Sequence, residues 1–156
     1  MSAVFFLDSN IVVKYYITEP GSAWVRNLIR SQNNTFFISE LSIVEVAAAL
    51  SQLRHHKQIS RRAMQQSYDR FLADIKQALF FAKPIDFETI ERAYAISLQH
   101  ALKGADAIQV ATAALFEDTI NVEVVFVSND RQALRAAQLE ALKVEDPAAY
   151  MEDLEN

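Results

Sequence analysis

The sequence predicts an α/β domain in which helices cover both faces of a mostly parallel sheet. Short apolar segments alternate with helical stretches along the whole chain, as is typical of βαβ units. The segment Val4–Leu7 has no polar break, which indicates a strand buried on both faces. The 156 residues contain no repeat, low-complexity segment or interdomain linker, so we expect one domain over residues 1–150. Residues 151–156 form an acidic tail that we expect to fray.

Hydrophobic patterning and turn residues predict where the individual elements lie. We expect five strands, at residues 4–7, 35–39, 78–82, 122–128 and 143–145. Helical spacing of apolar residues predicts helices at 11–17, 24–29, 42–56, 60–77, 86–98, 105–117 and 130–141. The helix pair between 42 and 77 is long for a simple crossover, so we expect it to project from the sheet. Ser9 or Asn10 could cap the first helix, and Ser60 could cap the fourth.

Composition excludes several classes of site. The chain has 15 basic and 20 acidic residues, so nucleic-acid binding would need a local basic patch or bridging cations. It has no cysteine, which excludes disulfides and thiolate metal sites. Its two glycines, Gly21 and Gly104, cannot build a glycine-rich phosphate loop. Because no signal-peptide pattern and no long apolar run occurs, we expect a cytoplasmic protein.

Four carboxylates stand beside predicted strand ends or helix starts: Asp8, Glu45, Asp106 and Asp130. Ligands of α/β sheets bind at the carboxyl ends of the strands, so these acids could share one site. Each also has a purely structural explanation. Asp8 and Asp130 could cap helices, Glu45 could complete a capping box with Ser42, and Asp106 could be a first-turn acid favoured by the helix dipole.

The surroundings of two of these acids favour a functional explanation. Glu45 and Asp106 lie on apolar helices, where an acid is rarely buried without a partner. No Lys or Arg lies within a helical turn of Glu45, and the nearest to Asp106 is Lys103. Two carboxylates about 4 Å apart repel by about 4 kcal/mol at an effective dielectric constant of roughly 20. A hard dication removes this repulsion, and an all-oxygen ligand set suits Mg²⁺ or Mn²⁺.

Four segments together resemble the PIN domain, and most of all the VapC-type toxins of bacterial and archaeal toxin–antitoxin pairs. They are Phe6–Asn10, Ser42–Glu45, Leu102–Ile108 and Val127–Asp130. The resemblance covers about Val4 to Pro147. It implies a parallel sheet of about five strands and Mg²⁺- or Mn²⁺-dependent cleavage of RNA. It also implies a small antitoxin protein, one segment of which lies in a groove near the site, and a homodimer.

The resemblance assigns expected roles to individual residues. Asp8, Glu45, Asp106 and Asp130 match the acidic positions of the family. We expect Asp8 and Asp106 to hold a first metal, and Asp130 to bind through water or hold a second ion. Glu45 would orient or deprotonate the attacking water, or act as a ligand. The residues expected to hydrogen-bond these acids or a phosphate oxygen are Ser9, Asn10 and Ser128. One departure is Glu140, which stands where a glycine is expected before the last strand.

Two other functions compete with this interpretation. A non-catalytic interaction module on the same fold would be expected to have lost part of the acid set, which is complete here. A phosphoacceptor receiver domain would need paired acids after the first strand and a lysine after the last, which Ser128–Asp130 does not supply. The basic segment Arg54–Arg62 could follow an RNA backbone or could be a solvated helix end.

Overall fold

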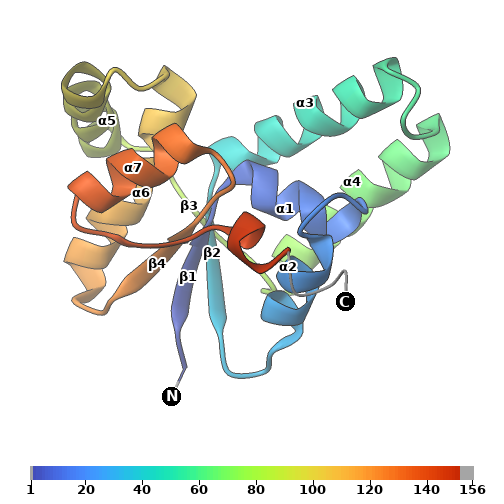
Figure 1. Ribbon diagram of the computed structural model, residues 1–156, viewed down its shortest axis with the longest axis horizontal. Helices are drawn as coiled ribbons and strands as arrows, with labels where there is room; N and C mark the ends of the chain where they lie inside the picture. Colours follow the sequence, from blue (N-terminus) through green and yellow to red (C-terminus); the bar gives the residue numbers. More distant parts are fainter. Residues whose placement is uncertain (1, 152–156) are drawn as a thin grey trace.

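One five-stranded sheet forms the centre of the molecule (Figure 1). The computed structural model describes residues 2–151. The sheet has the order β3-β2-β1-β4-β5, and every neighbouring pair is parallel. This confirms the predicted α/β fold. The strands are β1 (Val4–Leu7), β2 (Thr35–Ser39), β3 (Phe81–Lys83), β4 (Val124–Val127) and β5 (Lys143–Glu145).

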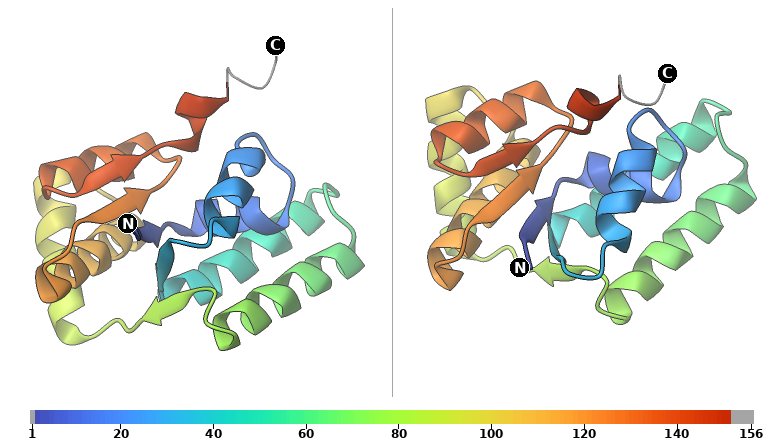
Figure 2. Two further views of the ribbon diagram at one scale, coloured as in Figure 1. Left: turned by 90° about the horizontal axis from the view of Figure 1, so that it is seen from below. Right: turned by 60° about the horizontal axis from the view of Figure 1, so that its bottom comes forward.

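Helices pack on both faces of the sheet (Figure 2). One face is covered by α5 (Phe87–His100), α6 (Gly104–Ile120) and α7 (Arg131–Leu139). The other is covered by α1 (Ser9–Tyr16), α2 (Ser22–Arg30), α3 (Leu41–His55) and α4 (Arg61–Lys76). A 3₁₀ helix, Pro147–Tyr150, follows β5.

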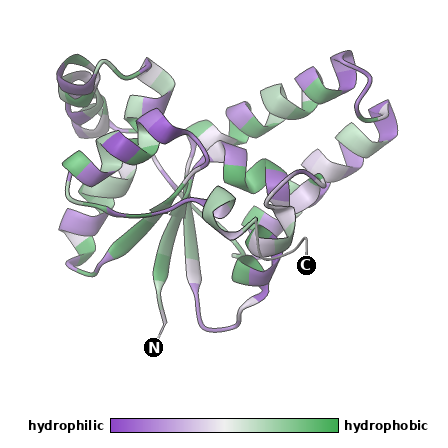
Figure 3. Ribbon diagram, in the orientation of Figure 1, coloured by the Kyte–Doolittle hydropathy of each residue, from purple (hydrophilic) through white to green (hydrophobic). Residues whose placement is uncertain are grey.

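The apolar run of β1 serves two cores because successive strand side chains point to opposite faces. Phe6 packs with the α5–α7 side and stacks on Phe126 of β4 at 6.1 Å between ring centroids. Phe5 and Leu7 pack with the α1–α4 side, where Phe5 stacks on Phe36 at 5.7 Å. The central strands are accordingly hydrophobic along their length (Figure 3).

The strand order reverses next to β1. The chain passes from β1 outward to β2 and β3, and then returns through α5 and α6 to place β4 on the other side of β1. The carboxyl ends of β1 and β4 are therefore adjacent, and the helices that follow them, α1 and α7, lie on opposite faces of the sheet. Such a switch point is where ligands bind in open α/β sheets.

Several predicted element boundaries differ from the structure by one to three residues, and three of these differences have a clear local cause. β3 begins at Phe81 and not at Ala78, because Ala78 has a left-handed φ of 60° and closes the turn after α4. Helix α1 begins at Ser9 and its cap is Asp8, not Ser9 or Asn10. Helix α3 begins at Leu41 after Glu40, so Ser42 is inside the first turn and the capping box with Glu45 is wrong.

Glu140, which stands where a glycine is expected before the last strand, does not itself adopt a left-handed backbone conformation. Glu140 is an ordinary helix cap with φ −86°, and the left-handed residue before β5 is Ala141 with φ 68°. The Glu140 carboxylate accepts from Arg92 Nη2 at 2.9 Å and lies 3.1 Å from His100 Nε2. The side chain thus ties α7 to α5.

The hairpin of α3 and α4 extends away from the sheet, as predicted (Figure 1). Ser60 caps α4 by accepting from Ala63 N at 3.0 Å, as predicted. Among residues 2–151, no helix is both long enough and apolar enough to cross a bilayer. Apart from Met151, the acidic tail predicted to fray lies outside the described residues.

Candidate functional site

Asp8 lies at the end of β1, and the residue is only 4% exposed. Its Oδ1 accepts from Ser9 N at 2.7 Å, which caps α1. Its Oδ2 accepts from Ser128 Oγ at 2.8 Å and, more weakly, from Asn10 Nδ2 at 3.3 Å. The prediction that Asp8 caps a helix is therefore correct, and the capping side chain lies at the switch point of the sheet.

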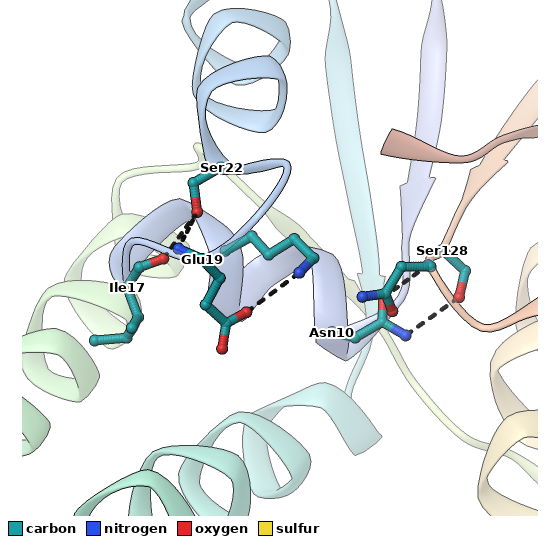
Figure 4. Close-up of polar contacts among 7 residues, drawn as sticks. Asn10, Ile17, Glu19, Ser22 and Ser128 are labelled. Carbon is teal, nitrogen blue, oxygen red and sulfur yellow. Dashed lines mark hydrogen bonds and ion pairs between the residues drawn. The ribbon is translucent and has the colours of Figure 1, made fainter. Parts of the chain in front are cut away.

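Asn10 and Ser128 link the two strand ends. Asn10 Nδ2 donates to Ser128 Oγ at 3.2 Å (Figure 4). Asn10 Oδ1 accepts from Asn129 N at 3.3 Å, and Ser128 Oγ accepts from Asp130 N at 3.0 Å. The two small polar side chains thus hold the loop after β4 against the start of α1.

Asp130 caps α7 as predicted. Its Oδ1 accepts from Gln132 N at 2.8 Å and from Ala133 N at 3.0 Å. Within residues 2–151, no hydrogen bond reaches its Oδ2. One carboxylate oxygen is thus used for the cap, and the other is available for a ligand.

Glu45 lies in the second turn of α3 and is partly buried. Its Oε1 accepts from Ser9 Oγ at 2.8 Å and from Gln109 Nε2 at 2.7 Å. Ser42, one turn earlier on α3, receives contacts from Ser9 Oγ at 3.0 Å and Gln109 Nε2 at 3.1 Å. This network connects α1, α3 and α6.

The pKa values of two of the acids show how the four influence one another. Burial raises the pKa of Asp8 to about 7, hydrogen bonds oppose this, and the charges of Asp106 and Glu45 add smaller increases. Burial also raises the pKa of Asp106, as do the charges of Asp130 and Glu45, whereas Lys103 lowers it. The acids are therefore near enough to repel one another.

Among the described residues, none of the four carboxylates has an ion-pair partner. The ion pairs of residues 2–151 involve none of Asp8, Glu45, Asp106 and Asp130. In the same part of the chain, no three Asp, Glu or His side chains are already arranged as a metal-binding group. The structure thus brings four acids to one sheet edge without a formed metal cage.

Sequence reasoning missed Gln109 in this region, and it named Ser42 only as a helix cap and as part of the segment that resembles the PIN domain. Gln109 is fully buried on α6 and contacts Ser9, Ser42 and Glu45. Its spacing of three residues from Asp106, on an otherwise apolar helix face, was the available signal. Ser42 could not be identified from sequence because its role depends on α3 beginning at Leu41.

A groove of about 280 Å³ opens beside this edge. Its apolar walls include Val13, Ala49 and Leu53, and Asn10 and Asn129 line it next to the acids. His56, from the end of the α3–α4 hairpin, also lines it. The groove therefore runs between the carboxylates and the basic hairpin.

Comparison with known families and structures gives a consistent result. The sequence pattern of the PIN domain matches residues 5–140. No curated protein is significantly similar to the chain. PAE2754 from Pyrobaculum aerophilum superposes with a TM-score of 0.65 at 15% identity, covering 97% of this chain and 89% of that one.

Two further similar structures are those of VapBC2 and VapC20. VapBC2 from Rickettsia felis, bound to a DNA fragment from its promoter, matches with a TM-score of 0.61 at 18% identity, covering 92% of this chain and 98% of that chain. Mycobacterium tuberculosis VapC20, a toxin that cleaves the sarcin–ricin loop, matches with a TM-score of 0.62 at 14% identity, covering 85% and 94%. At these identities the similarity establishes the fold.

Proposed function

Because the chain belongs to the PIN domain family, we propose that it is a Mg²⁺- or Mn²⁺-dependent endoribonuclease and the toxin of a toxin–antitoxin pair. The observation that carries this proposal is the convergence of four carboxylates, from four different elements, at the switch point of the sheet. Burial raises the pKa of Asp8 to about 7, and no cation of the described chain pairs with the four acids. Perturbed acids at a ligand-binding edge are typical of functional sites.

The donor set fits a hard divalent cation. Asp106 makes no side-chain hydrogen bond within residues 2–151, and Glu45 and Asp130 each use one oxygen for protein contacts. The remaining ligand atoms are all carboxylate oxygens, which Mg²⁺ and Mn²⁺ prefer. Asp106 is only partly buried, so both of its carboxylate oxygens are available for an ion.

We assign the residues distinct roles. Asp8 and Asp106 would hold the first ion, and Asp130 would bind it through water or hold a second. A bound dication supplies an acidified water and neutralises charge that develops on the phosphate. Glu45 orients or deprotonates the attacking water, or serves as a further ligand. Ser9, Asn10 and Ser128 fix the acids, because each donates to Asp8 or Glu45.

The antitoxin is proposed on two grounds. Similar structures include a toxin–antitoxin complex from Klebsiella pneumoniae, with a TM-score of 0.53 at 21% identity. The apolar groove that begins at Asn10 and Asn129 lies beside the acids and could hold a segment of such a partner. A toxin acting on cellular RNA would work in the cytoplasm.

The homodimer is proposed from an exposed apolar stripe on α5. Phe87, Tyr94 and Leu98 are 75%, 68% and 70% exposed, and Ile90 lies between them at 42%. These residues recur at helical spacing and so form one stripe. Contiguous exposed apolar surface of this kind marks an interaction site. An antiparallel pair of α5 helices from two copies would bury it.

The proposal is tested by incubating the purified protein with a mixed RNA pool in Mg²⁺, Mn²⁺ or EDTA. We expect cleavage with metal, none in EDTA, and a loss of at least a hundredfold in Asp8→Asn and Asp106→Asn. Asp118→Asn, an exposed acid on the same helix as Asp106, is the matched control and should cut normally. Cleavage that persists in EDTA or in both site variants would contradict the proposal.

A non-catalytic RNA- or protein-interaction module is the second candidate. The observation that favours it is the absence, among residues 2–151, of three acids already arranged around a metal position. It predicts RNA or protein binding that is insensitive to EDTA and to Asp106→Asn. The same RNA pool, followed by a gel-shift measurement, distinguishes the two functions.

A further inference from the structure

Gln109 is a polar side chain on the buried face of α6. Its exposure is 0%, and the residues that follow it toward the core, Val110, Ala111 and Ala113, are apolar and equally buried. An amide in such a place is costly unless its polar atoms find partners. Gln109 follows Asp106 by three residues, so both lie on one side of the helix.

The amide nitrogen of Gln109 reaches three oxygens. Nε2 lies 2.7 Å from Glu45 Oε1, 2.9 Å from Ser9 Oγ and 3.1 Å from Ser42 Oγ. An NH₂ group carries two hydrogens, so the three oxygens compete for it. The contact with Glu45 is the shortest and has a charged acceptor, which makes it the strongest of the three.

The other end of the Gln109 amide is its carbonyl oxygen, Oε1, which accepts no hydrogen bond from the described residues. Gln109 Oε1 is the one buried side-chain polar atom of residues 2–151 without a hydrogen-bond partner. Exchanging the two ends of the amide would place Oε1 2.7 Å from the Glu45 carboxylate, with two acceptors facing each other. The amide is therefore held with its NH₂ toward Glu45, at the expense of an unpaired carbonyl.

Both protein donors to Glu45 act on the same oxygen. Ser9 Oγ donates to Oε1 at 2.8 Å, in addition to Gln109. Within the described chain no hydrogen bond reaches Oε2. Fixing Oε1 fixes the direction of Oε2, because the carboxylate is planar.

We propose that Gln109 is a positioning residue that holds the Glu45 carboxylate so that its Oε2 faces the acidic site. This inference rests on the nuclease function proposed above. Gln109 reaches Glu45 from the helix that carries Asp106, and Ser9 reaches it from the residue next to Asp8. The two contacts thereby set the Glu45 carboxylate relative to both of those acids. Gln109 itself touches neither substrate nor metal.

The kinetic test compares Gln109→Leu with the wild type on one RNA substrate. We expect kcat to fall about tenfold and KM to change less than twofold, because Gln109 acts on the chemical step through Glu45. Thr112→Val is the matched control: Thr112 is a buried polar residue of the same helix, but its hydroxyl donates to Ile108 O at 2.7 Å. It should leave kcat unchanged.

A double variant separates positioning from general destabilisation. If Gln109 acts through Glu45, then adding Gln109→Leu to Glu45→Gln should cause no further loss of kcat. A full tenfold loss in both backgrounds, or wild-type kcat in Gln109→Leu, would overturn the inference. Melting temperatures of all variants identify any loss that arises from unfolding.

A second readout does not depend on catalysis. In ¹H–¹⁵N spectra of the metal-free protein, the Gln109 NH₂ signals should exchange slowly with solvent and shift in Glu45→Gln. They should not shift in Thr112→Val. If the wild type cleaves no RNA, the proposed nuclease function is wrong. The spectra then test only whether Gln109 contacts Glu45. Gln109 signals that are unmoved by Glu45→Gln would overturn the positioning role.

Discussion

Ser128 Oγ donates to Asp8 Oδ2 at 2.8 Å and so joins the carboxyl ends of β4 and β1. The backbone makes the same connection, since Asp8 N donates to Val127 O at 3.0 Å. These two bonds hold a buried carboxylate at the point where the strand order reverses. The hydrogen bond from Ser128 also stabilises the charged form of Asp8, which burial opposes.

Ser128→Ala should therefore raise the pKa of Asp8 above its present value of about 7, because the hydrogen bond from Ser128 lowers it. Carbon-detected NMR titration of the Asp8 carboxyl group in EDTA would measure this. Ser51→Ala, an exposed serine on α3, provides the control and should leave the titration unchanged. An unchanged Asp8 pKa in Ser128→Ala would show that the hydrogen bond is unimportant.

The raised pKa of Asp8 predicts a stability that falls as pH rises. The folded protein binds the Asp8 proton up to pH about 7, whereas the unfolded chain releases it near the ordinary aspartate pKa of 3.8. Between these values the folded state holds more protons, so the free energy of unfolding decreases with pH, by on the order of 4 kcal/mol in all. Urea unfolding in EDTA should give a more stable protein at pH 5.5 than at pH 8.

The Asp8→Asn variant has no titrating group at this position. The difference between its free energies of unfolding at pH 5.5 and pH 8 should therefore be smaller than in the wild type. The variant should be more stable than the wild type at pH 8, where the wild type buries a charge. An equal pH dependence of unfolding in Asp8→Asn and wild type would assign the effect to other groups.

Divalent metal should raise the melting temperature more at pH 8 than at pH 5.5, because protons compete with the ion for the carboxylates. Asp106→Asn should reduce the shift caused by Mn²⁺, and Asp118→Asn should not. Thermal scans with and without EDTA supply the measurement. A shift of the same size in both variants would place the ion elsewhere on the protein.

Ala141 has a φ of 68°, a conformation that disfavours any residue with a Cβ. Ala141→Gly should therefore stabilise the protein by up to about 1 kcal/mol, even though glycine makes the unfolded chain more flexible. Ala95→Gly, at an exposed position inside α5, should instead destabilise it by about 1 kcal/mol. Urea unfolding of both variants would check the contrast, and destabilisation by Ala141→Gly would refute it.

The α5 stripe predicts a change in assembly. Leu98→Glu places a charge at a residue that is 70% exposed in the single chain and would be buried in the proposed homodimer. Sedimentation should show a dimer for the wild type and a monomer for the variant, with both folded. A monomeric wild type would contradict the proposed homodimer.

The fold was predictable because its signals are local. Val4–Leu7 is apolar throughout and lies buried between two helical layers, and Asp8 directly after it marks the sheet edge. The start of β3 was not predictable because Ala78 adopts a left-handed turn without the glycine that normally reveals one.

The site was predictable only in part, for a different reason. Asp8, Glu45, Asp106 and Asp130 were identifiable as acids beside apolar segments, and their metal-binding role remains a prediction. The contacts among Ser9, Ser42 and Gln109 depend on how α3 and α6 pack against α1. That packing is tertiary, and the capping-box pattern of Ser42 favoured a local explanation that was wrong.

The most direct test of the central claim is the anomalous diffraction of a crystal grown with Mn²⁺. We expect a manganese peak at the switch point of the sheet, within about 2.5 Å of carboxylate oxygens of Asp8 and Asp106. A crystal of Asp106→Asn grown in the same way should lose the peak. Full Mn²⁺ occupancy elsewhere, with no peak beside Asp8 in the wild type, would contradict a metal-dependent nuclease site.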